Sequence, residues 1–499
     1  MAIGTWLGLE TSRRGVAVHQ NALDITGQNL ANASTPGYSR QEAVIRTTDP
    51  YTNPTLNSSC TPGQFGTGAT VDYIRRIKDE YLDNNVRKAN TDSGYWEDQI
   101  AVLQRAEACF AEPANDGTSK KIVEFFKSWM DLNNNPSDLG VKSAVVELGH
   151  TLATLMKANY NQLDSIERSV ATISGTTVES GMLVDQVTRI NTILTEIGSV
   201  TKSIQRVYEA GQQPNDLLDR RDVLLEELSH YGPVQINDGS TKGQPNGALE
   251  VKFFGETVFK DDGSEAVVTL EKLSLSYDVV NKEIRLGLSA TKSINLTKKE
   301  EIPSGNKFGE FGSLLGLENS RQIIMQQKIE LNSIAVALRD SIKKSNETIN
   351  TTNPPLTNPY PETVPTHPDF FVGDLVNGDF GVKDVIRKDP GTNIDGSRAR
   401  FIAELRDKDI PALKDNTFSD YYSLLVTQVG NGAKSADDMA GNQEAIKRQI
   451  TNLRDSVSGV QTDEELTKMM QFQSGFQASA RMITTINEML DVIINRMGV

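Results

Sequence analysis

The side chains best able to do chemistry gather in one short stretch, PNDLLDRRDVLLEELS, residues 214–229. Neighbouring carboxylates can act as a general acid and base, or they can pair with arginines on a solvated helix surface. Asp216 and Arg220 have the i,i+4 spacing of such a helix pair. We therefore interpret the stretch as a solvated helix face rather than a catalytic site. Its other charged residues are Asp219, Arg221, Asp222, Glu226 and Glu227.

The remaining reactive side chains are scattered, and no histidine has a metal-ligand partner at useful spacing. The histidines are His19, His150, His230 and His367. The stretch FGTGAT, residues 65–70, contains a Gly-x-Gly but no third glycine and no following helix, which favours a turn or strand kink over a phosphate cradle. We interpret Cys60 and Cys109 as two free thiols. The sequence predicts no enzyme activity, no metal and no cofactor.

Composition argues against several classes of partner. The 499 residues carry a formal net charge of −15 with a pI near 5.0, whereas binding of nucleic acid needs a basic face. No apolar run could span a membrane, and the N-terminus MAIGTWLGLETSRRG lacks the apolar core of a secretory signal. We therefore expect no nucleic-acid partner and no membrane partner, and either a cytosolic location or export without a cleaved signal peptide.

The elements at the two ends of the chain have heptad periodicity. Residues 1–33 read as a helix whose large apolar residues recur every seven positions, at Leu9, Val16, Leu23 and Leu30. We call the face of a heptad helix that contacts its partner the seam. The other seam positions of this helix are small or polar: Ser12, His19 and Thr26. The Pro36-Gly37 turn ends this helix, because proline lacks the amide donor and glycine accepts a positive φ. A helix of this kind needs partner helices.

The C-terminal region contains two long helices in a stretch without proline. Thr462 and Glu465 have the spacing of a capping box, which predicts that the second helix begins there. The seam of this helix is Met469, Phe472, Phe476, Ile483, Ile486, Leu490 and Ile493. Because neither end has an obvious partner, we predict a subunit of a polymer, in which each end completes its core against neighbouring copies.

Between the ends, the pattern predicts an elongated, multidomain, mainly α protein with a smaller β domain. Helical spacing returns at Tyr73, and alternating apolar residues around the DVVNKE turn, residues 278–283, predict strands. The predicted divisions are an axial helix and extended linker (1–73), a helical domain (74–234), a small β domain (235–305), a return helix (306–350), a proline-rich loop with a small mixed region (351–410), and coiled-coil helices (411–499).

Both ends of the chain resemble a known family. ALDITGQNLANASTPGYSR, residues 22–40, is similar to the N-terminal signature of bacterial flagellar rod, hook and hook-associated proteins. Residues 458–498 resemble the matching C-terminal signature. In the middle, residues 214–229, FFKSWMDLNNNPSD (125–138) and FSDYYSLLVTQVG (418–430) resemble the hook-associated protein 1 family of hook–filament junction proteins.

The resemblance implies a structural role at the hook–filament junction, with the terminal helices innermost and the β domain facing outward. The implied partners are further copies of the chain, the flagellar hook protein, the next hook-associated protein on the filament side, and an export chaperone that holds the C-terminal helix. The implied location is the extracellular flagellum, reached by type III export. The motif residues Asn29, Asn32, Pro36, Gly37 and Tyr38 would then contact the next subunit. The simpler alternative is that the asparagines cap their helix and Tyr38 packs on it.

Two other functions are compatible with axial ends. A flagellar hook or rod subunit is the alternative within the family, and the large helical middle argues against it. A secreted adhesin or enzyme on an axial frame is the alternative outside it. Residues 235–410 show no nucleophile–base or metal constellation, so we favour the structural role.

Overall fold

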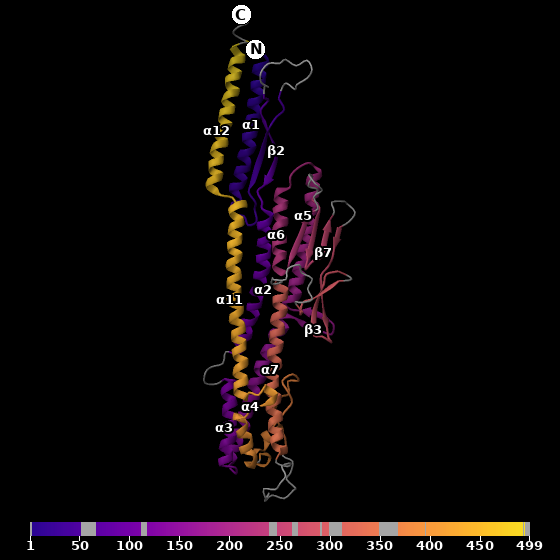
Figure 1. Ribbon diagram of the computed structural model, residues 1–499, viewed down its shortest axis with the longest axis vertical. Helices are drawn as coiled ribbons and strands as arrows, with labels where there is room; N and C mark the ends of the chain where they lie inside the picture. The colour runs from indigo at the N-terminus through magenta and orange to yellow at the C-terminus, as the bar shows by residue number, and fades with distance from the viewer. Residues whose placement is uncertain are drawn as a thin grey trace.

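The computed structural model is drawn out along one axis, and α1 (Ala2–Ala31) begins at the same tip where α12 (Thr462–Asp491) ends (Figure 1). The structure describes residues 2–50, 66–110, 117–238, 247–261, 268–289, 292–298, 312–348, 368–394, 396–492 and 494. No helix in these ranges is long and apolar enough to cross a membrane.

One end of the molecule is a slender unit that we call the rod. In the rod, α1 runs antiparallel to α12, and the strands β1 (Gln41–Thr47) and β2 (Ala69–Arg76) form an antiparallel ribbon against α1. Helix α11 (Phe418–Ser458) leads into α12 through a break at Gly459, where an added Cβ would lie 2.3 Å from the carbonyl oxygen of Asp455. The break separates the rod from the rest of the molecule, which we call the body.

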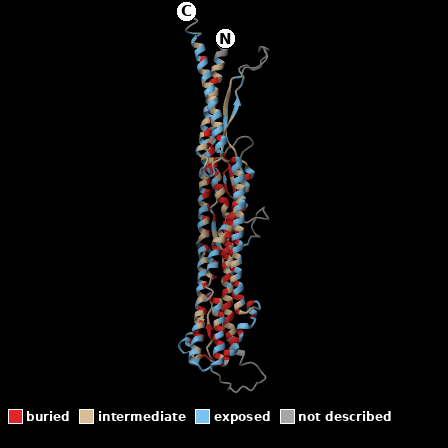
Figure 2. Ribbon diagram, turned by 90° about the vertical axis from the view of Figure 1, so that its left-hand side faces the viewer, coloured by how far each residue is buried: buried red, intermediate tan, exposed pale blue. Residues whose placement is uncertain are grey.

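The body is a helical bundle with an apolar core. Its helices are α2 (Glu80–Phe110), α3 (Thr118–Asn134), α4 (Leu139–Val170), α5 (Met182–Glu209), α6 (Asn215–Tyr231), α7 (Ser313–Thr348) and α11. Helix α3 shows why they form: Ile122, Phe125, Trp129 and Leu132 recur at helical spacing, and each is at most 3% exposed. Buried residues concentrate in the body, whereas the rod is mostly exposed or intermediate (Figure 2).

Two sheets cover one flank of the body beside α5 and α6 (Figure 1). One has the order β5 (Val234–Asp238), β6 (Leu249–Phe253), β7 (Glu256–Asp261), β8 (Val268–Leu270). The other has the order β11 (Ser293–Asn295), β10 (Glu283–Gly287), β9 (Ser274–Asp278), β4 (Thr177–Ser180), β3 (Thr172–Ser174). The DVVNKE turn joins β9 to β10 as predicted, but β3 and β4 come from outside the predicted range 235–305.

Short elements close the distal end of the body. They are β12 (Phe371–Val372), β13 (Gly381–Val382), α8 (Asp384–Lys388), α9 (Pro390–Asn393), α10 (Ala399–Glu404), and the 3₁₀ turns η2 (Gly396–Arg398), η3 (Leu405–Asp407) and η4 (Pro411–Leu413). Phe370 packs here against Phe125 and Trp129, with ring centroids 5.7 and 5.4 Å apart. The proline-rich part of this segment, residues 351–367, lies outside the described residues.

Two local predictions are wrong. The helix predicted from Tyr73 begins at Glu80, because residues 69–76 pair with β1 as a strand. The predicted capping box at Thr462 does not form: the N-cap residue of α12 is Gln461, and the Glu465 carboxylate turns to Asn29 and Lys468 instead. Tertiary contacts decide both outcomes against the local pattern.

Candidate functional site

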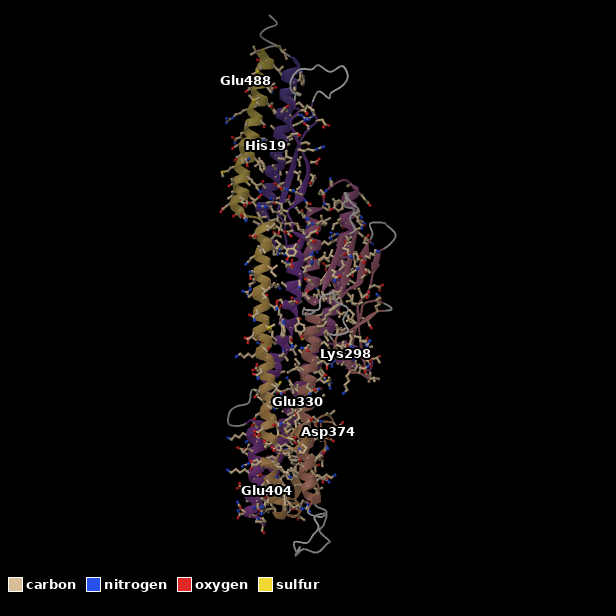
Figure 3. The ribbon with its side chains drawn as sticks, in the orientation of Figure 1. His19, Lys298, Glu330, Asp374, Glu404 and Glu488 are labelled. Carbon is tan, nitrogen blue, oxygen red and sulfur yellow. The ribbon has the colours of Figure 1, made fainter. Side chains whose placement is uncertain are left out.

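The rod is held together by small residues that let α1 and α12 approach closely. A Cβ added to Gly15 would lie 2.9 Å from the Ser479 hydroxyl, and one added to Gly8 would lie 3.4 Å from Ile486. The seven-residue step from Gly8 to Gly15 is matched by a seven-residue step back along α12, so the antiparallel register is constant. Figure 3 shows His19 in the rod. Its imidazole occupies the space beside Gly475, where an added Cβ would lie 2.5 Å from the ring.

On α1, the seam positions predicted for Leu9, Val16, Leu23 and Leu30 lie one residue earlier, at Gly8, Gly15, Ala22 and Asn29, whereas the predicted positions Ser12, His19 and Thr26 keep their place. Ser12 and Thr26 are buried, as are Ala22 and Asn29. Leu9, Val16, Leu23 and Leu30, which were predicted to form the a positions, are only half-buried. The prediction chose the largest apolar residues, but a close antiparallel contact selects glycine, alanine and serine, because their side chains allow the backbones to approach.

The half-buried predicted residues lie together on one outer face of the rod. Each helical residue advances about 100°, so the four on α1 point beside the seam, on the side away from the β1/β2 ribbon. Because α12 runs antiparallel, four of its predicted residues project to the same side. We call this set the outer groove; it comprises Leu9, Val16, Leu23, Leu30, Met469, Phe476, Ile483 and Leu490, all intermediate in exposure.

The remaining predicted residues of α12 have other positions. Phe472 belongs to the seam, and its ring centroid is 6.3 Å from that of His19. Ile486 is buried opposite Gly8. The Ile493 side chain lies outside the described residues. The predicted stripe is therefore divided between the seam, which is a contact within the chain, and the outer groove, which is a half-buried surface beside it.

At the lower end of the rod, Asn29 is the centre of a buried hydrogen-bond network. Its side-chain nitrogen donates to the backbone carbonyl of Gln41 (2.8 Å) and to the Glu465 carboxylate (2.9 Å). Its side-chain oxygen accepts from the Tyr38 hydroxyl and from the backbone N–H of Gln41 (3.0 Å each). Asn29 and Glu465 are each 1% exposed. The two signature segments, 436 residues apart, therefore meet in one cluster. Asn29 follows Ala22 by seven residues, so its contact with Glu465 keeps the antiparallel register of the seam.

The other residues of the N-terminal motif form the turn beside this network. The Asn32 amide donates to the Gln28 carbonyl, which caps the end of α1. Pro36 is exposed. Gly37 has φ +75°, and an added Cβ would lie 2.1 Å from the Val223 side chain of α6, so the turn requires glycine for both conformation and space. Tyr38 is half-buried, and burial raises the pKa of its hydroxyl, reinforced by Asp216 and Asp219.

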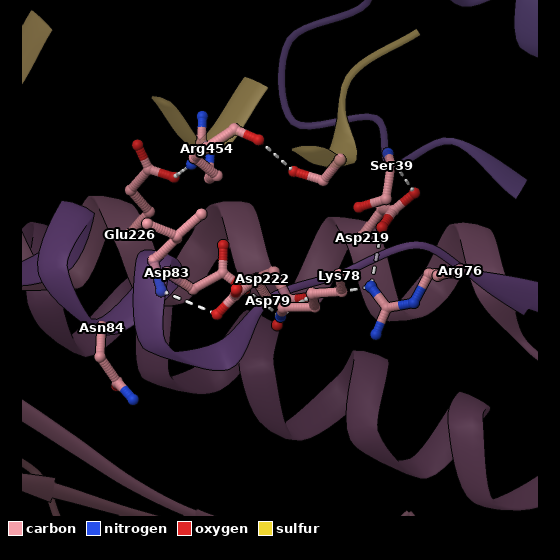
Figure 4. Close-up of polar contacts among 12 residues, drawn as sticks. Ser39, Arg76, Lys78, Asp79, Asp83, Asn84, Asp219, Asp222, Glu226 and Arg454 are labelled. Carbon is pink, nitrogen blue, oxygen red and sulfur yellow. Dashed lines mark hydrogen bonds and ion pairs between the residues drawn. The ribbon is translucent and has the colours of Figure 1, made fainter. Parts of the chain in front are cut away.

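Helix α6 receives this turn on its acidic face (Figure 4). Asp219 accepts hydrogen bonds from the Ser39 amide (3.0 Å) and from Arg76 (2.7 Å). Asp222 accepts from Arg76 (2.8 Å) and Lys78 (2.6 Å). The prediction of a solvated face is therefore wrong here: Asp219 is 6% exposed, because the turn and the end of β2 cover it.

The pairing predicted between Asp216 and Arg220 is also replaced. Asp216 accepts from the Gln41 side chain at 2.9 Å, and Arg220 points to Glu196 at 3.8 Å. Further along α6, Glu226 pairs with Arg454 of α11 at 2.8 Å. The acidic stretch is thus a structural connector between the rod, α6 and α11.

Burial and charge act in opposite directions on the two aspartates. Burial raises the pKa of Asp219 above its ordinary value, in spite of the Arg76 guanidinium. Burial alone would also raise the pKa of Asp222, but the Lys78 ammonium and Arg76 outweigh it and hold that pKa below its ordinary value. Asp222 is therefore a stable anion at neutral pH.

Two clefts flank the joint between rod and body. One, of about 760 Å³, is lined by the turn 33–39, the start of α2, α6 and the end of α11. The other, of about 630 Å³, is lined by α1, β2 and the loop 211–214 before α6. Charged residues that line the first cleft include Lys78, Asp222, Glu226 and Arg454, which pair with one another. This arrangement suits a mechanical joint rather than a reaction centre.

The candidate chemical residues are not brought together. Within the described ranges, no group of three or more His, Cys, Asp or Glu side chains could hold a metal ion. His150 and His230 lie on different helices, α4 and α6, and His367 and Cys60 lie outside the described residues. Cys109 is a free, half-buried thiol whose pKa is raised by burial.

Sequence reasoning missed Glu465 and two α6 aspartates, Asp216 and Asp219, as partners of the N-terminal segment. One signal was available. Gly8, Gly15, Ala22 and Asn29 are themselves spaced by seven residues, and a polar residue in a series of small ones marks a buried hydrogen bond.

Comparisons with known proteins give a consistent set of relatives. The flagellar hook-associated protein FlgK helical domain matches residues 103–349, the C-terminal domain of flagellar basal body rod FlgEFG proteins matches 454–497, and the flagella basal body rod protein model matches 9–38. Flagellar hook-associated protein 1 of Bacillus subtilis (strain 168) is 29% identical over 99% of both chains. That of Escherichia coli (strain K12) is 22% identical over 98% of this chain and 99% of its own. A solved structure of the flagellar hook junction protein FlgK from Burkholderia pseudomallei aligns with a TM-score of 0.40 at 20% identity, over 53% of this chain and 43% of that one.

Proposed function

The chain belongs to the family of flagellar hook-associated protein 1, and from that premise we propose that its rod is the element that builds it into the flagellar axis. It is a structural component of the bacterial flagellum, at the junction between hook and filament. The match of the helical-domain model to residues 103–349 does not favour a hook or rod subunit. We propose further that the role is structural rather than catalytic, and that the chain reaches the extracellular flagellum by export without a cleaved signal peptide.

The observation that carries the assembly proposal is the outer groove. Its eight large apolar side chains are only half-buried along the rod, although α1 and α12 already pack against each other through the seam. Full burial of such a side chain contributes about 1.5–3 kcal/mol, so burying the smaller part that is still exposed contributes roughly 0.5 kcal/mol per residue. Neighbouring rods packed into the groove would gain this energy at every contact.

The partners follow from the same surface. We propose that the groove packs against rods of further copies of this chain, and that hook protein and the next hook-associated protein offer similar helices on either side. Before assembly, an export chaperone would cover the α12 part of the groove, since Phe476 and Leu490 would otherwise be open to water. Contacts of Asn32, Pro36 and Tyr38 with the next subunit remain part of this proposal.

Phe476→Asp tests the groove. The charge would be buried against a neighbouring rod without a partner, so we expect the variant to lose binding to isolated hooks and to fail to restore motility. The matched control is Gln477→Asp, which adds the same charge at the neighbouring, exposed position.

Hydrogen exchange on both variants separates assembly from folding. The body, residues 80–348, should keep its protection in both, and Leu9→Asp should reproduce the defect from the α1 side of the groove. A Phe476→Asp protein that binds hooks as well as the Gln477→Asp protein would remove the groove as the assembly surface.

A further inference from the structure

A cluster of charged side chains lies inside the body, between α4 and α7 and outside the two clefts. Its members are Asp164, Glu167, Glu318, Arg321 and Lys328. Glu318 and Arg321 are the most buried of them, at 0% and 1% exposed. A buried ion pair adds little to stability, because the cost of desolvation offsets most of the attraction between the charges. The pair therefore needs an explanation other than added stability.

On the helical side, the pair is fully held by α7 and α4. The Arg321 guanidinium donates to both oxygens of the Glu318 carboxylate, from Nε at 2.7 Å and from Nη2 at 2.8 Å. Its Nη1 points to Glu167 at 3.5 Å, and Lys328 binds Glu167 (2.8 Å) and Asp164 (2.6 Å). Burial lowers the pKa of Arg321, but the hydrogen bonds and charge of Glu318 outweigh it and hold this pKa above its ordinary value. Arg321 is thus a buried cation fixed by its partners.

Glu318 also reaches the five-stranded sheet. Its Oε1 accepts from the Thr297 hydroxyl at 2.8 Å, just after β11, as well as from the Gln322 side chain at 2.8 Å. The Thr297 hydroxyl oxygen in turn accepts the backbone N–H of Ile284 in β10 at 3.1 Å. The backbone N–H of Thr297 donates to the Asn295 side chain at 3.0 Å, which fixes the turn that carries the hydroxyl. One carboxylate of α7 is thus connected to β10 and β11.

The strands held by this contact have a weak connection to the rest of their sheet. We call β9, β10 and β11 the outer strands. They meet the β3–β4 hairpin at a single paired position, Thr177 with Ser276. One backbone hydrogen bond beside it runs from the Tyr277 N–H to the Thr176 carbonyl at 2.8 Å. So short a ladder leaves the angle of the outer strands undetermined.

Packing on the bundle does not determine that angle either. The outer strands and the residues beside them bury aliphatic side chains, and hydrophobic contact has no preferred direction. These side chains are Ile284, Leu286, Leu288, Ile294 and Leu296. Asn191 of α5 clamps the backbone of Leu273, just before β9, at 3.0 and 2.8 Å, but it holds the start of one strand only. The ion pair of Lys292 with Glu256 of β7 is too exposed to add much.

We infer that Glu318, Arg321 and Thr297 form a polar key, which sets the position of the outer strands on the bundle rather than its stability. Moving these strands along α7 would separate the Thr297 hydroxyl from Glu318, whereas the aliphatic contact would change little. A hydrogen bond to a charged acceptor is strong and depends on distance and direction, so it selects one position. The inference goes beyond the assembly function and does not depend on it, because it concerns the sheet of a single chain.

Distances between spin labels measure the position of the outer strands. In the full chain with Cys60 and Cys109 replaced by serine, one label is placed at Val280, which is 89% exposed in the β9–β10 turn, and one at the exposed Lys434 of α11. We expect a single narrow distance distribution for this parent protein. Thr297→Val keeps the shape of the side chain and removes the hydroxyl, so its distribution should broaden or split. The matched control Thr297→Ser keeps the hydroxyl and should stay narrow.

An apolar replacement of the pair separates position from stability. In Glu318→Leu/Arg321→Met, both charges are lost together, so no buried charge is left without a partner. We expect its midpoint of unfolding in denaturant to equal or exceed that of the parent, while its distance distribution broadens. The matched control is Arg400→Met/Glu404→Leu, which removes an exposed ion pair of α10 and should change neither measurement.

Each outcome has a definite meaning. Broad distributions in Thr297→Val and in the apolar variant, with narrow ones in both controls, support the polar key. A distribution that stays narrow in Thr297→Val or in the apolar variant overturns it. A large fall in the unfolding midpoint of the apolar variant also overturns it, because the pair would then be a brace that stabilises the bundle.

Discussion

The buried amide of Asn29 offers the sharpest test of how the ends of the chain are joined. The change Asn29→Ala removes two donated and two accepted hydrogen bonds at a position that is 1% exposed. The bond to the ionised Glu465 is worth about 1.5–3 kcal/mol, and each neutral bond about 1 kcal/mol. Water that enters the small cavity would recover part of this. We therefore expect the free energy of opening of the rod to fall by about 3 kcal/mol.

Native-state hydrogen exchange measures this quantity segment by segment. A loss of 3 kcal/mol corresponds to exchange faster by roughly 100-fold for the slowest amides of residues 22–30 and 465–475, since each 1.4 kcal/mol is tenfold. The amides of the α3 and α4 core should be unchanged, because the body has a separate core. The matched control is Asn32→Ala, which removes one capping bond near the surface and should cost about 0.5–1 kcal/mol.

The reasoning fails if the two alanine variants behave alike. Equal small effects would mean that Asn29 and Glu465 do not hold the rod together in solution. Equal large effects that extend into α3 and α4 would mean that the rod and the body unfold as one unit. Only a large effect confined to the rod agrees with the geometry.

Two further predictions concern close packing and charge. Gly475→Ala places a Cβ 2.5 Å from the His19 ring, so thermal melting should show the rod destabilised by about 1–3 kcal/mol. The control Gly441→Ala, with nothing within 4 Å of the added Cβ, should stabilise its helix by about 0.5–1 kcal/mol. Equal effects of the two changes would contradict the tight packing of the seam. The pKa of Asp222 is lowered in the folded chain, so its stabilising pairing with Lys78 is present above the unfolded value near 4 and is lost as pH falls through the folded pKa. Asp222→Asn should therefore flatten the acid limb of the stability curve below about pH 4, and an unchanged acid limb would show that the pair contributes nothing.

Periodicity predicted the element types of this chain well, because long helices repeat one simple pattern many times. The heptads at both ends, the helical middle and the β9–β10 turn could all be found from spacing alone. The β3–β4 hairpin was missed because TISGTTVES has only a few apolar residues, and its pairing with β9 brings together segments far apart in the sequence. Local pattern holds no information about such a pairing.

The joint could be predicted only in part. The N-terminal motif stood out, but its partners did not, because Glu465 resembles a capping residue and Asp219 resembles any acidic residue on a helix surface. Their roles depend on their burial, because β2 and the turn, which are far away in the sequence, cover them in the folded chain. Half of the α1 seam positions were displaced by one residue for a related reason: hydrophobic size identifies a face of α1, whereas the partner helix decides which edge of that face it covers.

The 436 residues that separate Asn29 from Glu465 have a consequence for the order of folding. Closing a flexible loop of that length costs about 5 kcal/mol in chain entropy, so the ends of an unfolded chain would rarely meet. Once α2 and α11 have packed, the residues leading into the rod already lie side by side, and most of that entropy has been lost during formation of the body. Contacts of such high order form late and open early. We therefore expect the rod to be the last part of the chain to fold and the first to open. While it is open, α1 and α12 can pack either against each other or against a neighbouring subunit.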